Sequence, residues 1–450
     1  MKTLTKILPM GIILLWIISA CTTTQETTPE TALKDYLNND DTSFKWELAD
    51  SITTGNLTLY NLKLTSQNWR GYIWSHQLSV LVPEEVEYDG ALLFITGGSN
   101  KEGQPNWKQP DDATIKMMSM VAQKNKALVA VLFQVPNQPL YNDLTEDELI
   151  SFTFHNFRKD RDYTWPLLFP MVKSAIRAMD AIQEFTEESL DHEVKRFLVS
   201  GASKRGWTTW LTGANDKRVQ AIAPMVIDML NMPASIKYHL EAWGSYSIQI
   251  QDYVDLGIAQ DVDTPDGKDL VTMVDPYSYR KQLTMPKLIF NGTNDEYWPV
   301  DAIKHYINDI PGENYLHYVP NAGHGLGDKR QAIQALSAFY GNMLNNGNFP
   351  SISWDVKEHD KDLTFHVHKS DENLSGINVW SAYSEDRDFR DNEFKGTKVE
   401  YQNQDVLDIA LSLPDSGYRA IYIEFIYPDH NGESYSLNTR VYVTDSLRIL

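Results

Sequence analysis

Ser203 lies in a sequence context that suits a nucleophile. It belongs to the string Gly-Ala-Ser-Lys-Arg-Gly over residues 201–206, which follows a short apolar run at 196–200. Such a run next to glycine is typical of a buried strand in a parallel sheet. A strand that turns sharply into a helix lifts a serine hydroxyl to the end of the sheet, where the helix N-terminus stabilises negative charge. The string therefore predicts a nucleophile elbow.

A serine hydroxyl needs a base and a group that orients the base, and both have candidates downstream. Asp295 follows the apolar run 287–292, and His324 stands between glycines just past the run 315–319. Each candidate therefore comes soon after the carboxyl end of a predicted strand. The chain order Ser, Asp, His is that of the α/β-hydrolase fold. We predict a catalytic triad of Ser203, Asp295 and His324.

The electrophilic half of such a site also has candidates. The apolar run 91–96 leads into a double glycine and Ser99, early in the chain, where hydrolases of this fold place an oxyanion-hole loop. The backbone N–H groups of Gly98 or Ser99, together with that of Lys204, are expected to face the developing oxyanion. Loss of one such donor typically slows turnover by about 100- to 1,000-fold.

Each of these residues has a simpler interpretation when taken alone. A Gly-x-Ser-x-x-Gly string arises often by chance, an Asp after a strand commonly caps a helix or turn, and a His between glycines is usually a loop residue. The triad prediction rests on their joint occurrence in one order. The alternative from another class is a binding or signalling protein on a hydrolase scaffold, which the fold alone does not exclude.

The elements that must position these residues alternate between strand and helix. Apolar positions recur at helical spacing over 168–185, which indicates a helix packed on the sheet. The alternation pauses after residue 227, and the aromatic-rich segment at about 227–280 is predicted to form a lid over the site. We expect residues 46–347 to form an α/β-hydrolase fold, with a mostly parallel, doubly wound sheet.

Residues 350–450 carry a different pattern. Short alternating runs at 363–367, 421–425 and 440–443, separated by polar turns, indicate antiparallel strands. An Asn- and Gly-rich junction at 345–350 separates them from the preceding helix. We predict a small C-terminal β-sandwich-like domain with a core of its own.

The N-terminus has the features of a targeting segment. A positively charged start and a short apolar stretch lead to Cys21, the single cysteine of the chain. This pattern over residues 1–21 resembles a bacterial lipoprotein signal that ends in a lipidated cysteine; an uncleaved anchor or an ordinary secretory signal is the alternative. Residues 22–45 are polar and aperiodic, which predicts a flexible tether. We expect a lipid-anchored protein of the cell envelope, at the outer membrane.

The composition and net charge of the chain indicate which kinds of partner it can bind. The 450 residues carry a formal net charge of −21, and 42% of them are hydrophobic. Ordinary apolar content over this length predicts two folded units. Phosphate binding needs a concentrated basic face, so the charge argues against a nucleic-acid partner. No cofactor or metal is implied, because the one calcium-like string, at 261–272, lacks the required Gly and Glu positions.

Several strings resemble one known family. The segment 201–211, with those at 275–280, 286–298 and 380–390, is similar to the PhoPQ-activated pathogenicity-related proteins, which also take in the autocrine proliferation repressor proteins. The resemblance runs from the end of the predicted tether almost to the C-terminus. It implies an α/β-hydrolase-like domain followed by a C-terminal β domain, and it leaves the substrate open.

Arg205 departs from the usual elbow, which has glycine two residues after the serine. The resembled family carries the same Ser-Lys-Arg-Gly form. Lys204 and Arg205 are expected to pair with acidic residues elsewhere; in the alternative, one of them meets a substrate carboxylate. Trp207 and Trp298 are further candidates for substrate binding.

Together these features predict a serine hydrolase that acts through an acyl-enzyme on a peptide or small-molecule substrate. A peptidase is favoured, because the Gly-x-Ser-Lys-x-Gly string looks like the elbows of prolyl-peptidase relatives. A carboxylesterase acting on carbohydrate or other small esters is the alternative.

Overall fold

A computed structural model describes residues 26–347, 349–369, 373–401 and 406–450. The predicted signal over 1–21, with the lipidation site at Cys21, lies outside these ranges. Within them, none of the helices has the length and apolar character needed to cross a bilayer.

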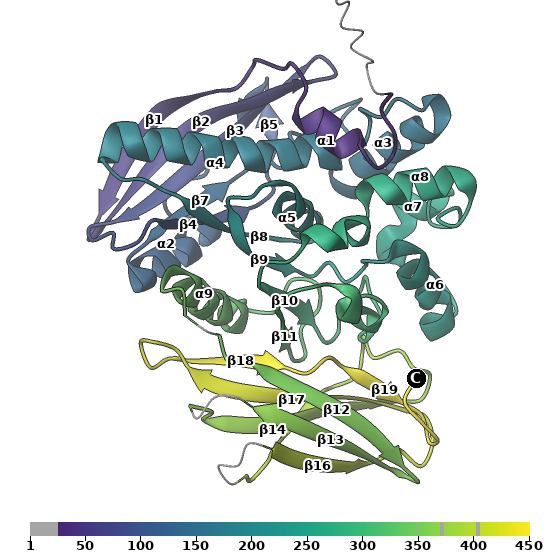
Figure 1. The fold of residues 1–450 in the computed structure, drawn as a ribbon. Coiled ribbons are helices and arrows are strands. Elements are labelled where there is room, and N and C mark those ends of the chain that lie inside the picture. Colours follow the sequence, from purple (N-terminus) through teal and green to yellow (C-terminus); the bar gives the residue numbers. More distant parts are fainter. Residues whose placement is uncertain (1–25, 348, 370–372, 402–405) are drawn as a thin grey trace, which may run out of the picture.

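A nine-stranded sheet forms the centre of the protein, in the order β1-β2-β3-β7-β4-β8-β9-β10-β11 (Figure 1). The first three strands run antiparallel, and the strands from β7 to β11 in this order run parallel to one another. The parallel strands are almost entirely buried, as expected for strands with helices on both faces. The strands are β1 (Lys45–Thr54), β2 (Leu57–Trp69), β3 (Tyr72–Pro83), β4 (Gly90–Ile95), β7 (Leu128–Leu132), β8 (Arg196–Ala202), β9 (Val219–Met225), β10 (Lys287–Gly292) and β11 (Asn314–Val319).

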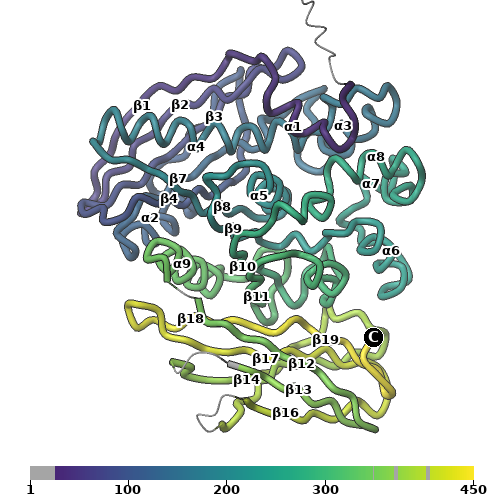
Figure 2. The backbone as a smooth tube through the Cα atoms, viewed as in Figure 1, coloured from purple at the N-terminus to yellow at the C-terminus, as the bar shows by residue number. Residues whose placement is uncertain are grey.

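Helices cover both faces of this sheet (Figure 2). Two of them share one buried cluster on one face, and two others share a second cluster on the opposite face. The helix predicted over 168–185 is present, and most of its apolar stripe is buried. These observations confirm the predicted α/β-hydrolase fold. The first pair is α4 (Leu168–Leu190) with α5 (Lys204–Asn215), and the second is α2 (Ala113–Asn125) with α9 (Arg330–Leu344).

The strand and helix alternation pauses after β9, as predicted for the segment 227–280. This segment is helical and packs against a further helix, α3 (Glu146–Asp160). Its elements are α6 (Met232–Trp243), η1 (Ile248–Ile250), α7 (Gln251–Asp255), α8 (Pro265–Val274) and η2 (Pro276–Gln282). The remaining short elements of this part are β5 (Asn100–Lys101), β6 (Gln104–Pro105), η3 (Ala302–His305) and η4 (Ile307–Asp309).

The prediction of a flexible tether over 22–45 is wrong for the part that the structure describes. The segment forms a short helix, α1 (Ala32–Leu37), whose Ala32, Leu33 and Tyr36 are buried in the main core. Six residues make too few helical turns to show a clear spacing of apolar residues, so the sequence did not indicate this helix.

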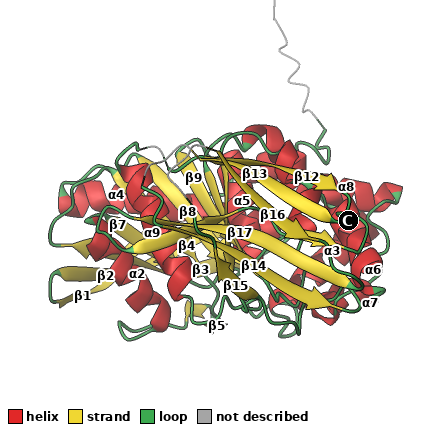
Figure 3. Ribbon diagram, turned by 90° about the horizontal axis from the view of Figure 1, so that it is seen from below, coloured by secondary structure: helices red, strands yellow, loops and turns green. Residues whose placement is uncertain are grey.

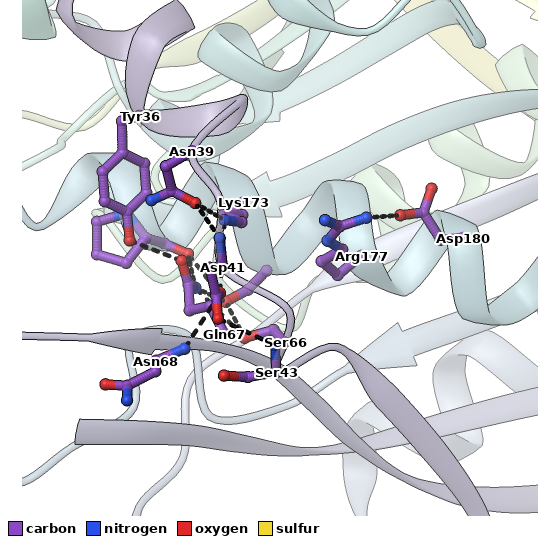
Figure 4. A network of polar contacts seen from close by, with 12 residues as sticks. Tyr36, Asn39, Asp41, Ser43, Ser66, Gln67, Asn68, Lys173, Arg177 and Asp180 are labelled. Carbon is purple, nitrogen blue, oxygen red and sulfur yellow. Dashed lines mark hydrogen bonds and ion pairs between the residues drawn. The ribbon is translucent and has the colours of Figure 1, made fainter. Parts of the chain in front are cut away.

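A buried lysine holds this segment in place. Lys173 of α4 is 1% exposed, and its ammonium donates to Asn39 Oδ1 at 2.5 Å and lies 3.5 Å from the carboxylate of Asp41 (Figure 4). The hydroxyl of Tyr36 donates to Gln67 Oε1 at 2.7 Å. An ammonium taken out of water requires such acceptors. The N-terminal segment therefore packs against α4 and bonds to β2.

The C-terminal region forms antiparallel sheets, as predicted, and they lie in front of the central sheet when seen from below (Figure 3). One sheet has the order β12-β13-β16, and the other has the order β15-β14-β17-β18 with β19 paired to β17. The strands are β12 (Ile352–His359), β13 (Asp362–Lys369), β14 (Gly376–Ser384), β15 (Lys395–Lys398), β16 (Val406–Ser412), β17 (Tyr418–Pro428), β18 (Ser434–Asn438) and β19 (Tyr442–Thr444).

The C-terminal strands also pack against the hydrolase part of the chain. Both buried clusters contain residues of the hydrolase part and of the C-terminal strands. Strand β18 lies beside β11, the last strand of the central sheet, where the N–H of Tyr318 donates to the side chain of Asn438 (Figure 1). Tyr318 also packs on Tyr422, with 5.5 Å between ring centroids. The C-terminal sheets therefore pack against the β11 edge of the central sheet.

Candidate active site

Ser203 occupies the predicted elbow between β8 and α5. Its backbone has φ 59° and ψ −127°, a combination that is strained for a residue with a side chain. The N–H of Ser203 donates to the carbonyl of Met225 at 2.9 Å, which ties the turn to the neighbouring strand β9. A strained serine at a strand-to-helix turn is the geometry of a nucleophile elbow.

Gly206 explains why this elbow tolerates Arg205. A Cβ on Gly206 would lie 2.8 Å from the carbonyl oxygen of Met225 and 2.9 Å from the side chain of Ile227. A Cβ on Gly201 would lie 2.8 Å from the carbonyl oxygen of Arg205. The close approach of helix to strand thus requires glycine at 201 and 206, and it leaves position 205 open to a side chain.

The Arg205 side chain is bound within the protein. Its guanidinium donates to the two carboxylate oxygens of Glu146 at 2.7 and 2.8 Å, and its Nε donates to the carbonyl of Val135 at 2.6 Å. Lys204 pairs with Glu146 at 2.8 Å and with Asp147 at 3.0 Å. Both cations therefore pair with acids elsewhere, and Arg205 is not available to bind a substrate carboxylate.

Glu146 and Asp147 were missed by the sequence reasoning, although the need of two adjacent cations for acidic partners was a signal. Burial alone would raise the pKa of Glu146, but the hydrogen bonds and charges of Arg205 and Lys204 hold it well below its usual value. Glu146 is therefore ionised at neutral pH.

Asp295 and His324, the predicted acid and base, form a hydrogen-bonded pair. The Nδ1 atom of His324 lies 2.9 and 3.0 Å from the two carboxylate oxygens of Asp295. Asp295 is 6% exposed, and this burial raises its pKa, whereas the hydrogen bond and charge of His324 oppose the rise. The N–H of Tyr297 also donates to Asp295 at 2.8 Å. The carboxylate is thus oriented to hold the imidazole ring.

Two further residues support the histidine loop. Glu296 accepts the backbone N–H of His324 at 2.9 Å. The ring of Tyr297 stacks on the imidazole, with 4.0 Å between centroids and 28° between planes. Both residues directly follow Asp295 in the sequence, yet nothing in their types or spacing indicated these roles.

The three candidates belong to one edge of the sheet, because each follows the carboxyl end of a parallel strand. Ser203 and His324 do not form a hydrogen bond. The Nε2 atom of His324 is buried, and no described residue bonds to it. Tyr297, which stacks on His324, lines the same cavity as Ser203. Hydrogen bonds of this kind are often long in free enzymes and tighten when substrate binds.

The candidate oxyanion loop lies beside the elbow. Ile95 at the end of β4 is in register with Gly201 of β8, so the residues that follow each strand are neighbours. Gly98 has φ +144°, a conformation that favours glycine, and its carbonyl accepts from the side chain of Gln138 at 3.0 Å. The N–H groups of Gly98 and Ser99 bond to no acceptor within the described chain. Lys204 begins α5, so its N–H also lacks a partner within the helix.

An apolar cavity opens beside Ser203. Residues of the 227–280 segment supply much of its wall, so this segment lies next to Ser203. The indole of Trp207 lines the cavity and donates to the carbonyl of Val274 at 2.5 Å. Trp298, three residues after Asp295 in the chain, lines the same cavity. Further lining residues are Ile227, Met229, Ile250, Tyr253 and Ile258. No group of three or more His, Cys, Asp or Glu side chains suited to a metal occurs in the described part of the chain.

The sequence of the chain matches the family description "PhoPQ-activated pathogenicity-related protein" over residues 33–390. The chain belongs to this family. The match begins at the docked N-terminal helix and ends inside the loop after β14, so it includes all three triad candidates. Among curated proteins, autocrine proliferation repressor protein A of Dictyostelium discoideum is 32% identical over 433 residues, which cover 88% of this chain and 86% of that protein.

Solved structures with a similar fold include two esterases. The acetyl xylan esterase of Paenibacillus sp. R4 is 13% identical, with a TM-score of 0.48, over 68% of this chain and 91% of that one. Acetyl xylan esterase 1 of Thermoanaerobacterium sp. JW/SL YS485 is 17% identical, with a TM-score of 0.46, over 69% and 92% of the two chains.

Proposed function

We propose that this protein is a serine hydrolase that works through an acyl-enzyme. The observation that carries the proposal is the pairing of a strained serine at a strand-to-helix turn with a hydrogen-bonded Asp295–His324 pair on the same edge of the sheet. Strain of this kind persists only where the surroundings impose it, and it is concentrated at functional sites.

In the proposed mechanism, the hydroxyl of Ser203 attacks a substrate carbonyl while Nε2 of His324 accepts its proton. Asp295 orients the imidazole through Nδ1 and stabilises the imidazolium that forms. The N–H groups of Lys204 and of Gly98 or Ser99 stabilise the oxyanion. His324 then gives the proton to the leaving group, and the acyl group stays bonded to Ser203. Water attacks this acyl-enzyme while His324 accepts a proton from the water, and His324 returns the proton to the Ser203 oxygen as the acyl group leaves.

The substrate that we propose carries an apolar group next to the scissile carbonyl. The cavity beside Ser203 is walled by aliphatic and aromatic side chains, and such a wall favours an apolar side chain or acyl chain over a sugar ring. A peptide with an apolar residue at this position fits the predicted peptidase activity. An ester of an apolar acid fits the same cavity and is the substrate of the alternative.

We further propose that the protein is anchored to the cell envelope through a lipid on Cys21. The sequence pattern over 1–21 and the position of the single cysteine support this location. Replacement Cys21→Ser should leave the precursor unprocessed and unlabelled by radioactive fatty acid. Continued labelling of this variant would contradict the anchor.

The decisive experiment for activity is labelling with a broad fluorophosphonate probe, followed by peptide mapping. Wild-type protein should carry the probe on Ser203, and Ser203→Ala should carry none. Hydrolysis of leucyl and phenylalanyl nitroanilides, compared with the matching esters, then separates a peptidase from an esterase. Absence of both labelling and hydrolysis would favour the non-catalytic binding protein.

A further inference from the structure

A loop of the C-terminal region reaches the candidate active site. Residues 385–394 connect β14 to β15, and part of this loop belongs to the string at 380–390 that marks the family. The loop lies at the side of β10 and β11, where the central sheet ends (Figure 1). The loops that carry Asp295 and His324 follow these two strands, so no further strand of the sheet supports them on that side.

Asn294 joins the acid loop to this segment. Its side-chain amide donates to three backbone carbonyls, those of Phe389 at 2.9 Å, Arg390 at 3.2 Å and Asn392 at 2.8 Å. Asn294 directly precedes Asp295 in the chain. Three acceptors around one amide fix its position, and they thereby restrain the backbone that carries the carboxylate.

Asn321 joins the histidine loop to the same segment. Its amide nitrogen donates to the carbonyl of Phe394 at 2.9 Å, and its amide oxygen accepts the N–H of Phe394 at 2.7 Å. The backbone N–H of Asn321 donates to Thr293 Oγ1 at 2.8 Å, which links the histidine loop to the acid loop. The two catalytic loops and residues 385–394 therefore form one hydrogen-bonded unit.

The loop also contacts the helix that helps to wall the cavity. Arg387 donates to the hydroxyl of Tyr238 at 2.7 Å, and the guanidinium of Arg390 lies 4.1 Å from the ring centroid of Trp243. Both aromatic residues belong to α6, and the same helix contributes Met232 and Ile236 to the cavity wall. Cation–π contacts of this geometry stabilise the packing of α6 on the loop.

We propose that loop 385–394 of the C-terminal region positions the acid and base of the hydrolase, with Asn294 and Asn321 as the positioning residues. This inference rests on the proposed function of Asp295 and His324. It makes the C-terminal sheets part of the catalytic unit and not a separate binding module. A small displacement of reacting groups can slow turnover by about 100-fold, so loss of either asparagine should act on kcat.

The experiment compares Asn294→Ala and Asn321→Ala with the control Asn438→Ala. Asn438 also bonds across the boundary between the two parts, to the backbone of Tyr318 within β11, and among the described residues its side chain has no hydrogen bond to the loops that carry Asp295 and His324. The two test variants should lower kcat by about 10- to 100-fold with KM little changed. The control should leave both constants near their wild-type values.

Hydrogen exchange measured by mass spectrometry supplies a readout that does not depend on activity. Peptides that cover 293–298 and 320–327 should exchange faster in both test variants than in wild-type protein, because exchange reports local opening. In the control their exchange rate should be unchanged. Exchange and kcat that match those of the control would overturn the inference. So would faster exchange with an unchanged kcat, since the loops would then be held but not positioned for catalysis.

The two proposals fail in different ways. If wild-type protein is labelled on Ser203 but the asparagine variants behave like Asn438→Ala, the hydrolase proposal stands and the positioning role is overturned. If wild-type protein neither labels nor turns over substrate, the hydrolase proposal is overturned and the catalytic role of the loop with it. The exchange measurement then still decides whether residues 385–394 restrain the two loops.

Discussion

Arg205 and Glu146 form two parallel hydrogen bonds, from Nη1 to Oε2 at 2.8 Å and from Nη2 to Oε1 at 2.7 Å. Arg205 lies two residues after Ser203, whereas Glu146 begins a helix 59 residues earlier in the chain. A fork-to-fork pair of this kind fixes orientation as well as distance. It braces a turn whose serine is held in a strained backbone conformation.

Replacement of Glu146 by Gln should therefore weaken both the fold and the activity. The variant loses the charge that Lys204 and Arg205 share, and hydrogen bonds to charged groups contribute about 1.5–3 kcal/mol each. We expect a drop in the free energy of unfolding of about 1–3 kcal/mol at pH 7, measured by urea denaturation, and a lower kcat. Glu193→Gln, which removes an exposed pair with Lys195, is the control and should change stability by less than about 1 kcal/mol.

The same variant should differ from wild type in its response to acid. The pKa of Glu146 is lowered in the folded protein, so its contribution to stability is complete above its unfolded pKa of about 4.3 and is lost as the pH falls below that value. The stability difference between wild type and Glu146→Gln should accordingly shrink between pH 5 and pH 3. A constant difference over this range would contradict the ionised pair.

Gly206→Ala should damage the elbow. The new Cβ would meet the carbonyl oxygen of Met225 at 2.8 Å, and backbone at this distance must shift to make room. We expect a loss of stability of about 1–3 kcal/mol, the usual cost of overpacking, and a large loss of fluorophosphonate labelling at Ser203. Gly376→Ala, whose Cβ would meet only the side chain of Ile426 at 3.4 Å or more, is the matched control and should be well tolerated.

Asp228 should make the protein less stable at alkaline pH. Burial raises the pKa of Asp228 to about 8, in spite of the hydrogen bond from the hydroxyl of Tyr306 at 2.6 Å. The unfolded chain ionises near pH 3.9, so the folded protein keeps a proton that the unfolded chain releases. This contribution to stability is complete below about pH 4 and is lost as the pH rises towards 8.

Asp228→Asn should remove much of that slope. Its free energy of unfolding, measured by urea denaturation, should fall less than that of wild type between pH 5 and pH 8, with a difference on the order of a few kcal/mol at pH 8. Burial also raises the pKa of Asp275 to about 7, so part of the slope should remain. The exposed Asp328→Asn variant serves as a control, and it should keep the wild-type slope. Equal slopes for wild type and Asp228→Asn would refute the assignment.

The proposed triad predicts a pattern of losses. Ser203→Ala and His324→Ala should each reduce kcat by about 10⁴- to 10⁶-fold, and the double variant should be no worse, because groups that act as a unit are not additive. Asp295→Asn should cost somewhat less, on the order of 10⁴-fold, since it disturbs the tautomer of His324 and leaves the base in place. Near-normal turnover by Ser203→Ala would rule out the serine-hydrolase mechanism.

Much of the site was predictable because its signals are local. The apolar run before Ser203 and the glycines at 201 and 206 report a buried strand and a crowded turn. Asp295 and His324 each follow a strand of the same parallel sheet, and that placement brings their side chains to one edge. Hydrophobic period and turn composition act over a few residues, so the sequence by itself determined the fold class and the triad candidates.

Partner choice was decided only by the tertiary structure. The residues around Arg205 do not indicate that Glu146 is its partner. Those around Lys173 do not indicate Asn39 and Asp41. Those beside Asn294 do not indicate the carbonyls at 389–392. Each of these pairings joins segments at least 59 residues apart. A buried charge or amide must find partners wherever the folded chain supplies them, and which partners come within reach is set by how the strands and loops pack.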